Sequence, residues 1–361
     1  MKICFDNEVF WQQKFSGVAS RYYFNLIKYL VNNNDIDLKV FASIYLNEKI
    51  EKLPKKILSG YRLKNRIPYT GKFFEKLNFA ICKYQIKKFN PHILHKTYYS
   101  SNLEKVNSKV ILTVFDLWHE KNSDYKYMPK KNSLNIADHI LCPSNKTKKD
   151  LIEIYNIEKE KVTVTYFGIE NLTNNKNLSN YSNFNKKFLL FVGSRGRYKN
   201  FINFVKAFSK SEILKKDFFI ICFGGGSFSI DEKKLFHELQ ISNRIIKSEN
   251  DNDETLYNLY IKAYCLVYPS AHEGLGLPPL EAMSLGCPVI SSNHEAIVEG
   301  VGNAAVLFDP LNIDEIKSQL ESTLYSKEKI EELIKNGNLQ AKKFSWEKCA
   351  NETLEIYKRF A

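Results

Sequence analysis

The feature that most constrains the fold of this 361-residue chain is an alternation of short apolar runs with segments of helical periodicity. The apolar run 188–192 ends at Gly193 and is followed by a helical pattern over about 200–209. The first half repeats this arrangement, since the apolar run 2–5 precedes a helical pattern over 17–30. Strands that alternate with helices at such short intervals form parallel sheets with helices on both faces. We therefore predict an α/β protein built on parallel sheets.

Two domains are predicted from the length, on the rough prior of about 150 residues per domain. Residues 171–185 include seven asparagines and lack the periodicity of a helix or a strand, so we expect a linker over 171–186. The N-terminal domain would comprise 1–170 and the C-terminal domain 187–343, with a last helix, 344–361, that packs back on the first domain. Because open parallel sheets bind ligands at the carboxyl ends of their strands, we expect both sheets to face an interdomain cleft.

Composition and cysteine usage exclude several classes of protein. The longest uncharged run, 218–230, has 13 residues including three glycines, fewer than the ~18 apolar residues that a membrane span requires. Asp6 and Glu8 interrupt the N-terminal apolar segment, so we interpret it as a strand and not as a signal peptide. The seven cysteines form no C-x-x-C pair, which argues against a disulfide framework and against a zinc site. We predict a cytoplasmic protein.

Positive charge is concentrated between residues 60 and 90. The whole chain has 53 Lys and Arg against 40 Asp and Glu, and segment 60–90 interleaves eight bases and seven aromatic residues with one acid, Glu75. This mixture suits an anionic lipid surface, near which each base contributes about 1 kcal/mol. Single-stranded nucleic acid and an ordinary solvated helix with core aromatics are the other interpretations. We predict an anionic membrane surface as the partner, with peripheral attachment to the inner face of the cytoplasmic membrane, and no nucleic acid.

The segment 270–288 carries the clearest chemical signal. A buried strand ends at Pro269, a glycine-containing loop follows, and two prolines then open a helix, where proline is tolerated. Gly274 and Gly276 allow the loop backbone to approach a ligand closely. Exposed amides and the positive end of the helix dipole attract phosphate. We therefore predict a phosphate site at this strand-to-helix corner.

Two carboxylates flank the predicted phosphate site. Glu281 falls in the first turn of the helix, where it can accept hydrogen bonds from two neighbouring ribose hydroxyls. Glu273 stands at the start of the loop, where it can bind sugar hydroxyls. On spacing alone, both could be ordinary surface carboxylates beside a tight turn.

This segment resembles the donor-binding signature of retaining GT-B glycosyltransferases of family 4, also called glycosyltransferase group 1, and in particular of polysaccharide and O-antigen mannosyltransferases. The resemblance covers nearly the whole chain. It implies two Rossmann-like domains, an N-terminal one for the acceptor and a C-terminal one for the nucleotide sugar. Besides Glu273 on the sugar, the donor-binding residues that it implies in this segment are Gly274, Leu275, Gly276, Leu277 and Glu281.

Two further segments of the second half match the same family. The segment 191–200 resembles the strand and loop that carry a phosphate-binding Arg and Lys, which would be Arg195 and Lys199, with Arg197 as a rival for the first. Paired cations there would offset the negative charge that develops on a diphosphate leaving group. The three glycines after Cys222 resemble the family's base-side glycine turn, which makes Gly225 a donor-binding candidate; alternatively they form a mere tight turn.

In the first half, the family's loop before the first long helix corresponds to Ser16-Gly17, so Gly17 alone keeps the close backbone approach. The stretch 113–120 resembles the one that supplies a His-Asp near the reacting carbon. Phe115 occupies the usual histidine position, which leaves Asp116 and His119 as catalytic or sugar-contacting candidates, with acceptor-side or structural roles as the alternative. His95 matches another family segment and could equally be a core histidine.

No metal site and no cofactor apart from the donor substrate is predicted. The pattern Asp251-Asn-Asp253 precedes a helical periodicity and is typical of an acidic helix cap. The pattern Asp35-Ile-Asp37 lies in an asparagine-rich turn. Neither pattern follows the end of an apolar strand, where a metal-binding D-x-D would be expected.

The predicted activity is transfer of a hexose, with retention, from a nucleoside-diphosphate sugar to a hydroxyl. The subgroup resembled favours mannose from GDP-mannose and a lipid-linked or oligosaccharide acceptor in surface polysaccharide or lipopolysaccharide synthesis. The alternatives are another GT-B enzyme, such as a UDP-sugar transferase, an epimerase or a phosphorylase, or a binding protein without catalytic activity. No carboxylate is clearly placed as a covalent nucleophile, so front-face displacement is the working hypothesis.

Overall fold

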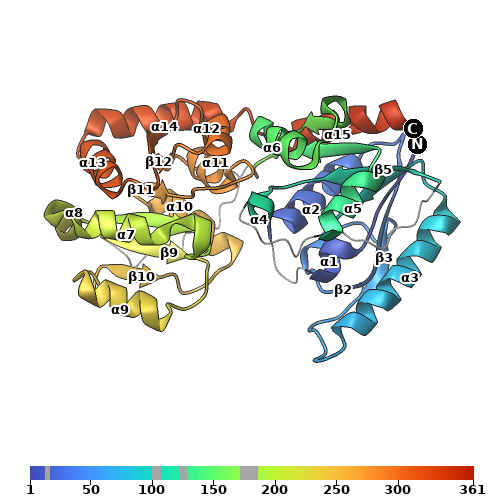
Figure 1. Ribbon diagram of the computed structural model, residues 1–361, viewed down its shortest axis with the longest axis horizontal. Helices are drawn as coiled ribbons and strands as arrows, with labels where there is room; N and C mark the ends of the chain where they lie inside the picture. Colours follow the sequence, from blue (N-terminus) through green and yellow to red (C-terminus); the bar gives the residue numbers. More distant parts are fainter. Residues whose placement is uncertain (13–16, 100–106, 122–127, 171–185) are drawn as a thin grey trace. The chain divides into compact units, whose positions relative to one another are not determined.

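The computed structural model describes residues 1–12, 17–99, 107–121, 128–170 and 186–361 (Figure 1). The chain contacts divide it into two compact units. The first consists of Met1–Gly168 together with Trp346–Ala361, and the second consists of Ile169–Ser345. The predicted linker lies outside the described residues except for its last residue, Lys186.

The first unit is built on a seven-stranded parallel sheet in the order β3-β2-β1-β4-β5-β6-β7. Its strands are β1 (Lys2–Phe5), β2 (Asp37–Tyr45), β3 (Leu58–Arg62), β4 (Ile93–Lys96), β5 (Lys109–Thr113), β6 (His139–Cys142) and β7 (Val162–Val164). Residues 3–5 of the central strand β1 are fully buried, as expected for a parallel strand that is covered on both faces.

Seven α-helices are described in the first unit: α1 (Glu8–Gln12), α2 (Val18–Leu30), α3 (Gly71–Phe89), α4 (Trp118–Lys121), α5 (Met128–Ile136), α6 (Asn145–Tyr155) and the C-terminal α15 (Trp346–Phe360). Helix α15 packs along α2 within this unit. Its Tyr357 is fully buried, and the phenol oxygen lies 2.5 Å from Nδ1 of His95. His95 is therefore a core histidine that joins the last helix to β4.

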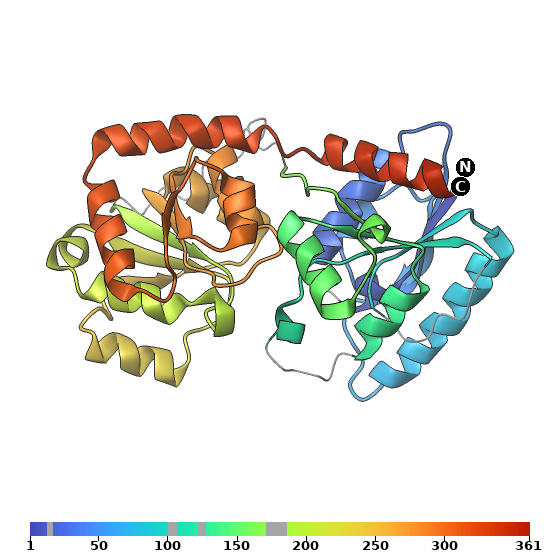
Figure 2. The same cartoon turned by 45° about the horizontal axis from the view of Figure 1, so that its top comes forward.

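The second unit contains a six-stranded parallel sheet in the order β10-β9-β8-β11-β12-β13. Its strands are β8 (Phe188–Val192), β9 (Phe219–Phe223), β10 (Ile245–Lys247), β11 (Cys265–Tyr268), β12 (Val289–Ser292) and β13 (Val306–Phe308). Its α-helices are α7 (Phe201–Ser209), α8 (Glu212–Asp217), α9 (Ile230–Glu238), α10 (Asp253–Lys262), α11 (Leu277–Ser284), α12 (Glu295–Val301), α13 (Ile313–Leu324) and α14 (Lys327–Ala341). The prediction of an α/β protein with parallel sheets is confirmed (Figure 2).

Strands β2 and β3 were not predicted from the sequence. Strand β3 is an edge strand with only partial burial, so it has little apolar signal, and polar residues interrupt β2. Gly60 in β3 has a φ of +157°, and a Cβ there would lie 2.6 Å from the carbonyl oxygen of Ser43. The close approach of the two backbones thus requires glycine at this position.

The strand order reverses between β1 and β4 in the first unit and between β8 and β11 in the second. Crevices form at the carboxyl ends of the strands where the order of a parallel sheet reverses, because the flanking connections leave in opposite directions. The loops that follow β8 and β11 are therefore the natural ligand site of the second unit. Among the helices that the structure describes, none has both the length and the apolar character needed to cross a membrane.

Candidate functional site

Lys199 and Glu273 meet at the carboxyl end of the second sheet. Lys199 ends the short 3-10 turn Arg197–Lys199 after β8, and Glu273 lies in the loop after β11. The two side chains form an ion pair, and Lys199 Nζ also donates to the phenol oxygen of Tyr268 at 3.2 Å. Tyr268 donates in turn to Oε1 of Glu273 at 2.6 Å. The structure thus joins two residues that the sequence placed in one site.

This cluster is shielded from water, which controls the ionisation of Glu273. Burial alone would raise the pKa of Glu273, but the positive charge of Lys199 and hydrogen bonds from Lys199, Tyr268 and Ser270 hold it below its usual range. Tyr268 is 1% exposed. Its burial, and to a smaller extent the negative charge of Glu273, raise the pKa of its phenol well above the usual value. At neutral pH Glu273 is therefore a carboxylate and Tyr268 a neutral phenol.

The predicted phosphate loop leads into α11. Gly276 is the N-cap of this helix and adopts φ +88°, a left-handed conformation that glycine accepts readily. Within the described part of the chain, the N–H groups of Leu275, Gly276 and Leu277 donate to no other residue. Pro278 and Pro279 follow and have no N–H to offer. The free amides of this corner are thus those of the residues just before the prolines.

Glu281 lies on α11 and is 3% exposed. Its Oε2 accepts a hydrogen bond from the hydroxyl of Tyr260 at 3.2 Å. Tyr260 comes from α10 and is fully buried, so the carboxylate is held against the neighbouring helix. A fixed carboxylate can accept hydrogen bonds from two adjacent ribose hydroxyls. Contact with ribose stays a prediction.

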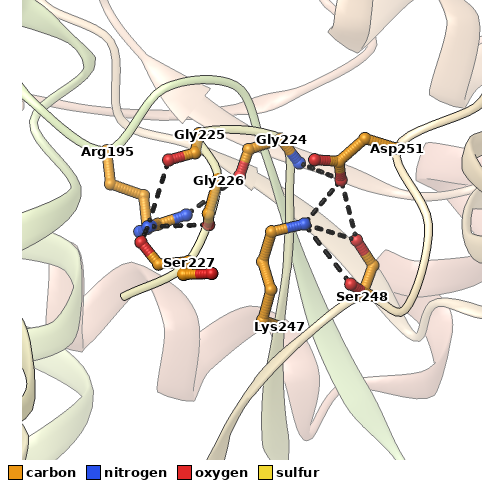
Figure 3. A network of polar contacts seen from close by, with 8 residues as sticks. All are labelled: Arg195, Gly224, Gly225, Gly226, Ser227, Lys247, Ser248 and Asp251. Atoms are coloured by element: carbon orange, nitrogen blue, oxygen red, sulfur yellow. Dashed lines mark hydrogen bonds and ion pairs between the residues drawn. The ribbon is translucent and has the colours of Figure 1, made fainter. Parts of the chain in front are cut away.

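The side chain of Arg195 points into the glycine loop, defined here as residues 224–227 (Figure 3). It donates to main-chain carbonyls of this loop and to the carboxylate of Glu232. Gly225, at φ +75°, is therefore in direct contact with Arg195. Contact of Arg195 or Gly225 with a diphosphate stays a prediction. The side chain of the rival Arg197 lies outside the described part of the structure.

Of the three candidates of the first unit, Gly17 and Asp116 lie just before helices and His119 lies on α4. Gly17 is the N-cap of α2, with φ −81° and ψ 167°, which any residue can adopt. Asp116 follows β5, and its Oδ1 accepts the N–H of Trp118 at 3.1 Å. The ring of His119 packs on Trp118 at 4.9 Å between centroids. Ser16, next to Gly17, lies outside the described residues.

Lys130 anchors both the loop that contains Asp116 and the helix α4 that carries His119. Its Nζ donates to the carbonyl oxygen of Asp116 at 3.0 Å and pairs with Glu120 at 2.8 Å. Tyr155 of α6 donates to the same carboxylate at 3.0 Å. These contacts fix the backbone of the loop at the carboxyl end of β5.

Among the described residues, no group of three or more His, Cys, Asp or Glu side chains is arranged to hold a metal ion. Helix α10 begins at Asp253, and Asn252 caps it by accepting the N–H of Thr255 at 2.8 Å. Asp251, in contrast, accepts from the Gly224 N–H at 3.0 Å and from Lys247 at 2.5 Å. The helix start predicted for this D-x-D pattern is therefore present, but its cap is Asn252 and not an aspartate, and Asp251 binds the glycine loop instead.

Sequence reasoning missed three residues that support the site. Tyr268 bridges Lys199 and Glu273, Tyr260 holds Glu281, and Glu232 holds Arg195. A buried tyrosine at the end of a strand has no pattern that separates it from core residues. Glu232 could have been found from the sequence, because Ser229 and Glu232 have the spacing of a capping box. Both hydrogen bonds of that capping box are present in the structure.

Comparison with known proteins agrees with this architecture. The family model described as "Glycosyltransferase Family 4" matches residues 19–171, and the model described as "Glycosyl transferases group 1" matches 174–340. The chain is 26% identical to O-antigen chain mannosyltransferase B of Escherichia coli, over 99% of this chain and 100% of that protein. It is 30% identical to O-antigen chain mannosyltransferase RfbU of Salmonella typhimurium, over 50% of this chain and 49% of that protein.

A solved structure shows the same fold. Sucrose-phosphate synthase from Thermosynechococcus elongatus superimposes with a TM-score of 0.79 over 99% of this chain and 98% of that one, at 18% sequence identity. Identity this low supports the fold alone. The two family models, which together span most of both units, identify the family: the chain is a glycosyltransferase of family 4, glycosyltransferase group 1, with the GT-B fold.

Proposed function

We propose that this enzyme transfers mannose from GDP-mannose, with retention, to a hydroxyl of a lipid-linked or oligosaccharide acceptor in the synthesis of a surface polysaccharide such as an O-antigen. The observation that carries this proposal is the alignment over the full length with an O-antigen chain mannosyltransferase. The second mannosyltransferase, which matches half of the chain, gives further support.

The second unit would hold the donor. The free amides of Leu275, Gly276 and Leu277 bind the diphosphate together with Lys199. Glu281 accepts hydrogen bonds from the ribose hydroxyls, and Glu273 accepts them from the sugar. The ion pair between Lys199 and Glu273 supports this division, because a phosphate that takes over Lys199 leaves the carboxylate of Glu273 to the hydroxyls of the transferred sugar.

The chemistry we propose is a front-face displacement. The bond between the anomeric carbon and the diphosphate oxygen breaks while the acceptor oxygen forms its bond to the same face of that carbon. The acceptor proton moves to the departing phosphate oxygen, so the products are GDP and a glycoside with retained configuration. Lys199 and the loop amides stabilise the negative charge on the leaving group.

The first unit would contribute Gly17, Asp116 and His119. Gly17 opens α2, where the absence of a side chain permits close approach of the donor. Asp116 and His119 lie at the carboxyl end of β5, where parallel sheets bind ligands. We assign these two side chains to hydroxyls of the transferred sugar or of the acceptor.

A donor screen by thermal unfolding tests the choice of nucleotide sugar. A ligand at 100 times its Kd stabilises the folded state by about 2.7 kcal/mol, which raises Tm by several degrees. We expect GDP-mannose to raise Tm more than UDP-glucose, UDP-galactose or ADP-glucose at equal concentration. A larger shift with a UDP-sugar or an ADP-sugar would overturn the choice of GDP-mannose.

A membrane surface would bring the enzyme to a lipid-linked acceptor. Helix α3 lies along the outer edge of the first unit (Figures 1 and 2). Within 60–90 some aromatic residues pack on neighbouring rings and others are exposed, while Phe79 is partly buried beneath Lys83. Phe74 packs on Trp11 and Phe89 on Phe41, with ring centroids 5.5 Å and 5.7 Å apart. The exposed large apolar side chains are Tyr61, Ile67, Tyr69, Phe73 and Tyr84.

Basic side chains lie next to this exposed apolar group in the sequence. Lys64, Lys72 and Lys76 are exposed, whereas Arg62 pairs with Glu48 and Glu51 at 2.6 Å and 2.5 Å. Aromatic tips with flanking lysines match an anionic bilayer, whose headgroups attract the charges while the rings enter the interface. We therefore propose peripheral attachment of this surface to the inner face of the cytoplasmic membrane.

A further inference from the structure

The buried guanidinium of Arg195 donates hydrogen bonds to the carbonyl oxygens of all four residues of the glycine loop (Figure 3). The side chain of Arg195 is 4% exposed. Its Nη1 donates to the carbonyl oxygen of Gly224 at 2.9 Å. Its Nη2 donates to the carbonyls of Gly225, Gly226 and Ser227 at 3.3, 3.1 and 2.9 Å. Four consecutive carbonyl oxygens therefore point toward one cation.

Glu232 holds the same guanidinium in place. Its Oε1 accepts from Nε of Arg195 at 2.7 Å, and its Oε2 accepts from Nη2 at 3.3 Å. Oε2 also accepts the N–H of Ser229 at 2.7 Å, as part of the capping box of α9. Burial alone would raise the pKa of Glu232, but hydrogen bonds from Arg195 and Ser229 lower it below its usual range. Arg195 is thus a neutralised, oriented group and not a mobile surface cation.

The orientation of the carbonyls determines where the amides of the loop point. In a trans peptide unit the C=O of one residue and the N–H of the next are antiparallel, and the described chain contains no cis peptide bond. Because the carbonyls of 224–226 face Arg195, the N–H groups of Gly225, Gly226 and Ser227 face away from it. Within the described residues these three N–H groups donate to no other residue.

Two further features fix the glycine loop beside the loop 193–199, which carries Lys199. The N–H of Gly224 donates to Asp251, whose Oδ1 also accepts from Lys247 and Ser248 at 2.5 Å and 3.2 Å (Figure 3). A Cβ on Gly225 would lie 3.2 Å from the carbonyl oxygen of Gly193, which begins the loop that carries Lys199. The glycine loop therefore borders the site assigned to the diphosphate.

We propose that Arg195 is a positioning residue for the donor: it holds the glycine loop so that the N–H groups of Gly225, Gly226 and Ser227 bind the nucleotide sugar, and it does not contact the diphosphate itself. This inference rests on the proposed function for the identity of the donor. Arg195, which the sequence predicts as a ligand of the diphosphate, would thus act indirectly, by orienting four peptide units of the glycine loop.

The test compares Arg195→Lys, Glu232→Gln and their double variant, with Asp314→Asn as control. Asp314 forms an exposed ion pair with Lys210 in the same unit. Asp314→Asn therefore removes one paired carboxylate, as Glu232→Gln does, but at a position away from the glycine loop. Steady-state kinetics with GDP-mannose and amide hydrogen exchange of 223–228 without ligand are measured. We expect both single variants to raise the donor KM about tenfold, with kcat and the acceptor KM within about twofold, and the double variant to add little.

The kinetic result separates the two modes of action. If Arg195 binds the diphosphate directly, Glu232→Gln leaves donor affinity unchanged or tighter, because it removes a competitor for the guanidinium. That outcome would overturn the proposal, and so would unchanged exchange in Arg195→Lys of the Gly224 amide, the N–H of the loop that is bonded to Asp251. The exchange experiment needs no donor, so it decides the role of Arg195 even where GDP-mannose proves to be the wrong substrate.

Two glycines of the loop supply a matched pair of variants. Gly225 and Gly226 have nearly the same φ, +75° and +70°, so alanine causes similar backbone strain at either. At Gly225 the added Cβ would lie 2.9 Å from Nη1 of Arg195 and also 3.2 Å from the carbonyl oxygen of Gly193, whereas at Gly226 it meets nothing within 4 Å. We expect Gly225→Ala to raise the donor KM at least fivefold more than Gly226→Ala, by about 1 kcal/mol. Equal effects would contradict the role of the guanidinium.

Discussion

Lys199 and Glu273 neutralise each other in the described structure, with Tyr268 between them. In the site we propose, the negative charge of the diphosphate competes with Glu273 for Lys199. Since Glu273 remains ionised at neutral pH, its release from Lys199 would provide an acceptor for the sugar hydroxyls when the phosphates bind. At the residue scale we therefore expect donor binding to replace the ion pair: the diphosphate binds Lys199, and the sugar hydroxyls bind Glu273.

Replacing Glu281 and replacing Glu273 should have different effects on the kinetic constants. We expect Glu281→Ala to raise the donor KM by about tenfold to a hundredfold, because hydrogen bonds to a charged group are each worth about 1.5–3 kcal/mol. We expect Glu273→Ala to lower kcat by about two orders of magnitude, which corresponds to about 2.7 kcal/mol. Steady-state kinetics measure both, with the exposed Glu238→Ala as control. Near-normal constants for both variants would contradict the assignment of the donor site.

At the scale of elements, α15 joins the first unit through a buried histidine. Nδ1 of His95 faces the hydroxyl of Tyr357, and Nε2 faces that of Thr113 at 2.9 Å. Burial lowers the pKa of His95 to about 3, so the ring stays neutral in the folded protein. The last helix of the chain is thereby attached to β4 and β5 by an imidazole that must not be protonated.

This attachment predicts a loss of stability in acid. The folded pKa of His95, about 3, lies below its usual value of 6.5, so between these pH values only the unfolded chain binds the proton. The free energy of unfolding should fall by up to about 1.4 kcal/mol per pH unit below pH 6.5. Trp11, Trp118 and Trp346 all belong to the first unit, so tryptophan fluorescence in urea reports this unit.

The variant His95→Asn separates this effect from other titrations. We expect it to be less stable than the parent at pH 7.5 and to lose about 1 kcal/mol less on going to pH 5.5. His139, whose pKa is lowered to about 4 by burial and neighbouring cations, continues to titrate in both proteins. An equal acid-induced loss in parent and variant would show that His95 is not the group responsible.

At the scale of the whole molecule, the exposed apolar and basic surface of 60–90 predicts attachment to anionic vesicles. Replacing Lys64, Lys72 and Lys76 together by Gln should weaken binding by more than a hundredfold at low salt, since each base contributes about 1 kcal/mol. Co-sedimentation with phosphatidylglycerol vesicles measures the affinity.

The control for the membrane prediction is the triple Gln variant of the exposed Lys233, Lys234 and Lys335 in the second unit. It has the same loss of charge and should bind as the parent does. A second variant, Tyr69→Ser with Phe73→Ser, should weaken binding even at high salt, because ring insertion is not screened. Unchanged binding of the first triple variant would remove the membrane from the proposed function.

Much of this architecture could be predicted from local pattern. Buried parallel strands such as β8 and β11 are continuous apolar runs, and the glycines and prolines around α11 mark a strand-to-helix corner. The edge strand β3 has no such pattern, because its burial comes from neighbours distant in the sequence. The same reason applies within the site. Arg195 was predicted as a phosphate ligand, and only the fold shows that Glu232 and four carbonyls already hold its guanidinium.

The central claim, that this chain moves mannose from GDP-mannose through the donor site of its second unit, is tested most directly by a transfer assay. GDP-mannose is incubated with a mannose-containing lipid-linked acceptor and with either the parent enzyme or Lys199→Met, and the product is analysed by mass and by the anomeric NMR signal. We predict one added mannose in the α configuration with the parent and a loss of at least about a hundredfold in rate with Lys199→Met. A β-linked product, or equal rates for parent and variant, would contradict the account.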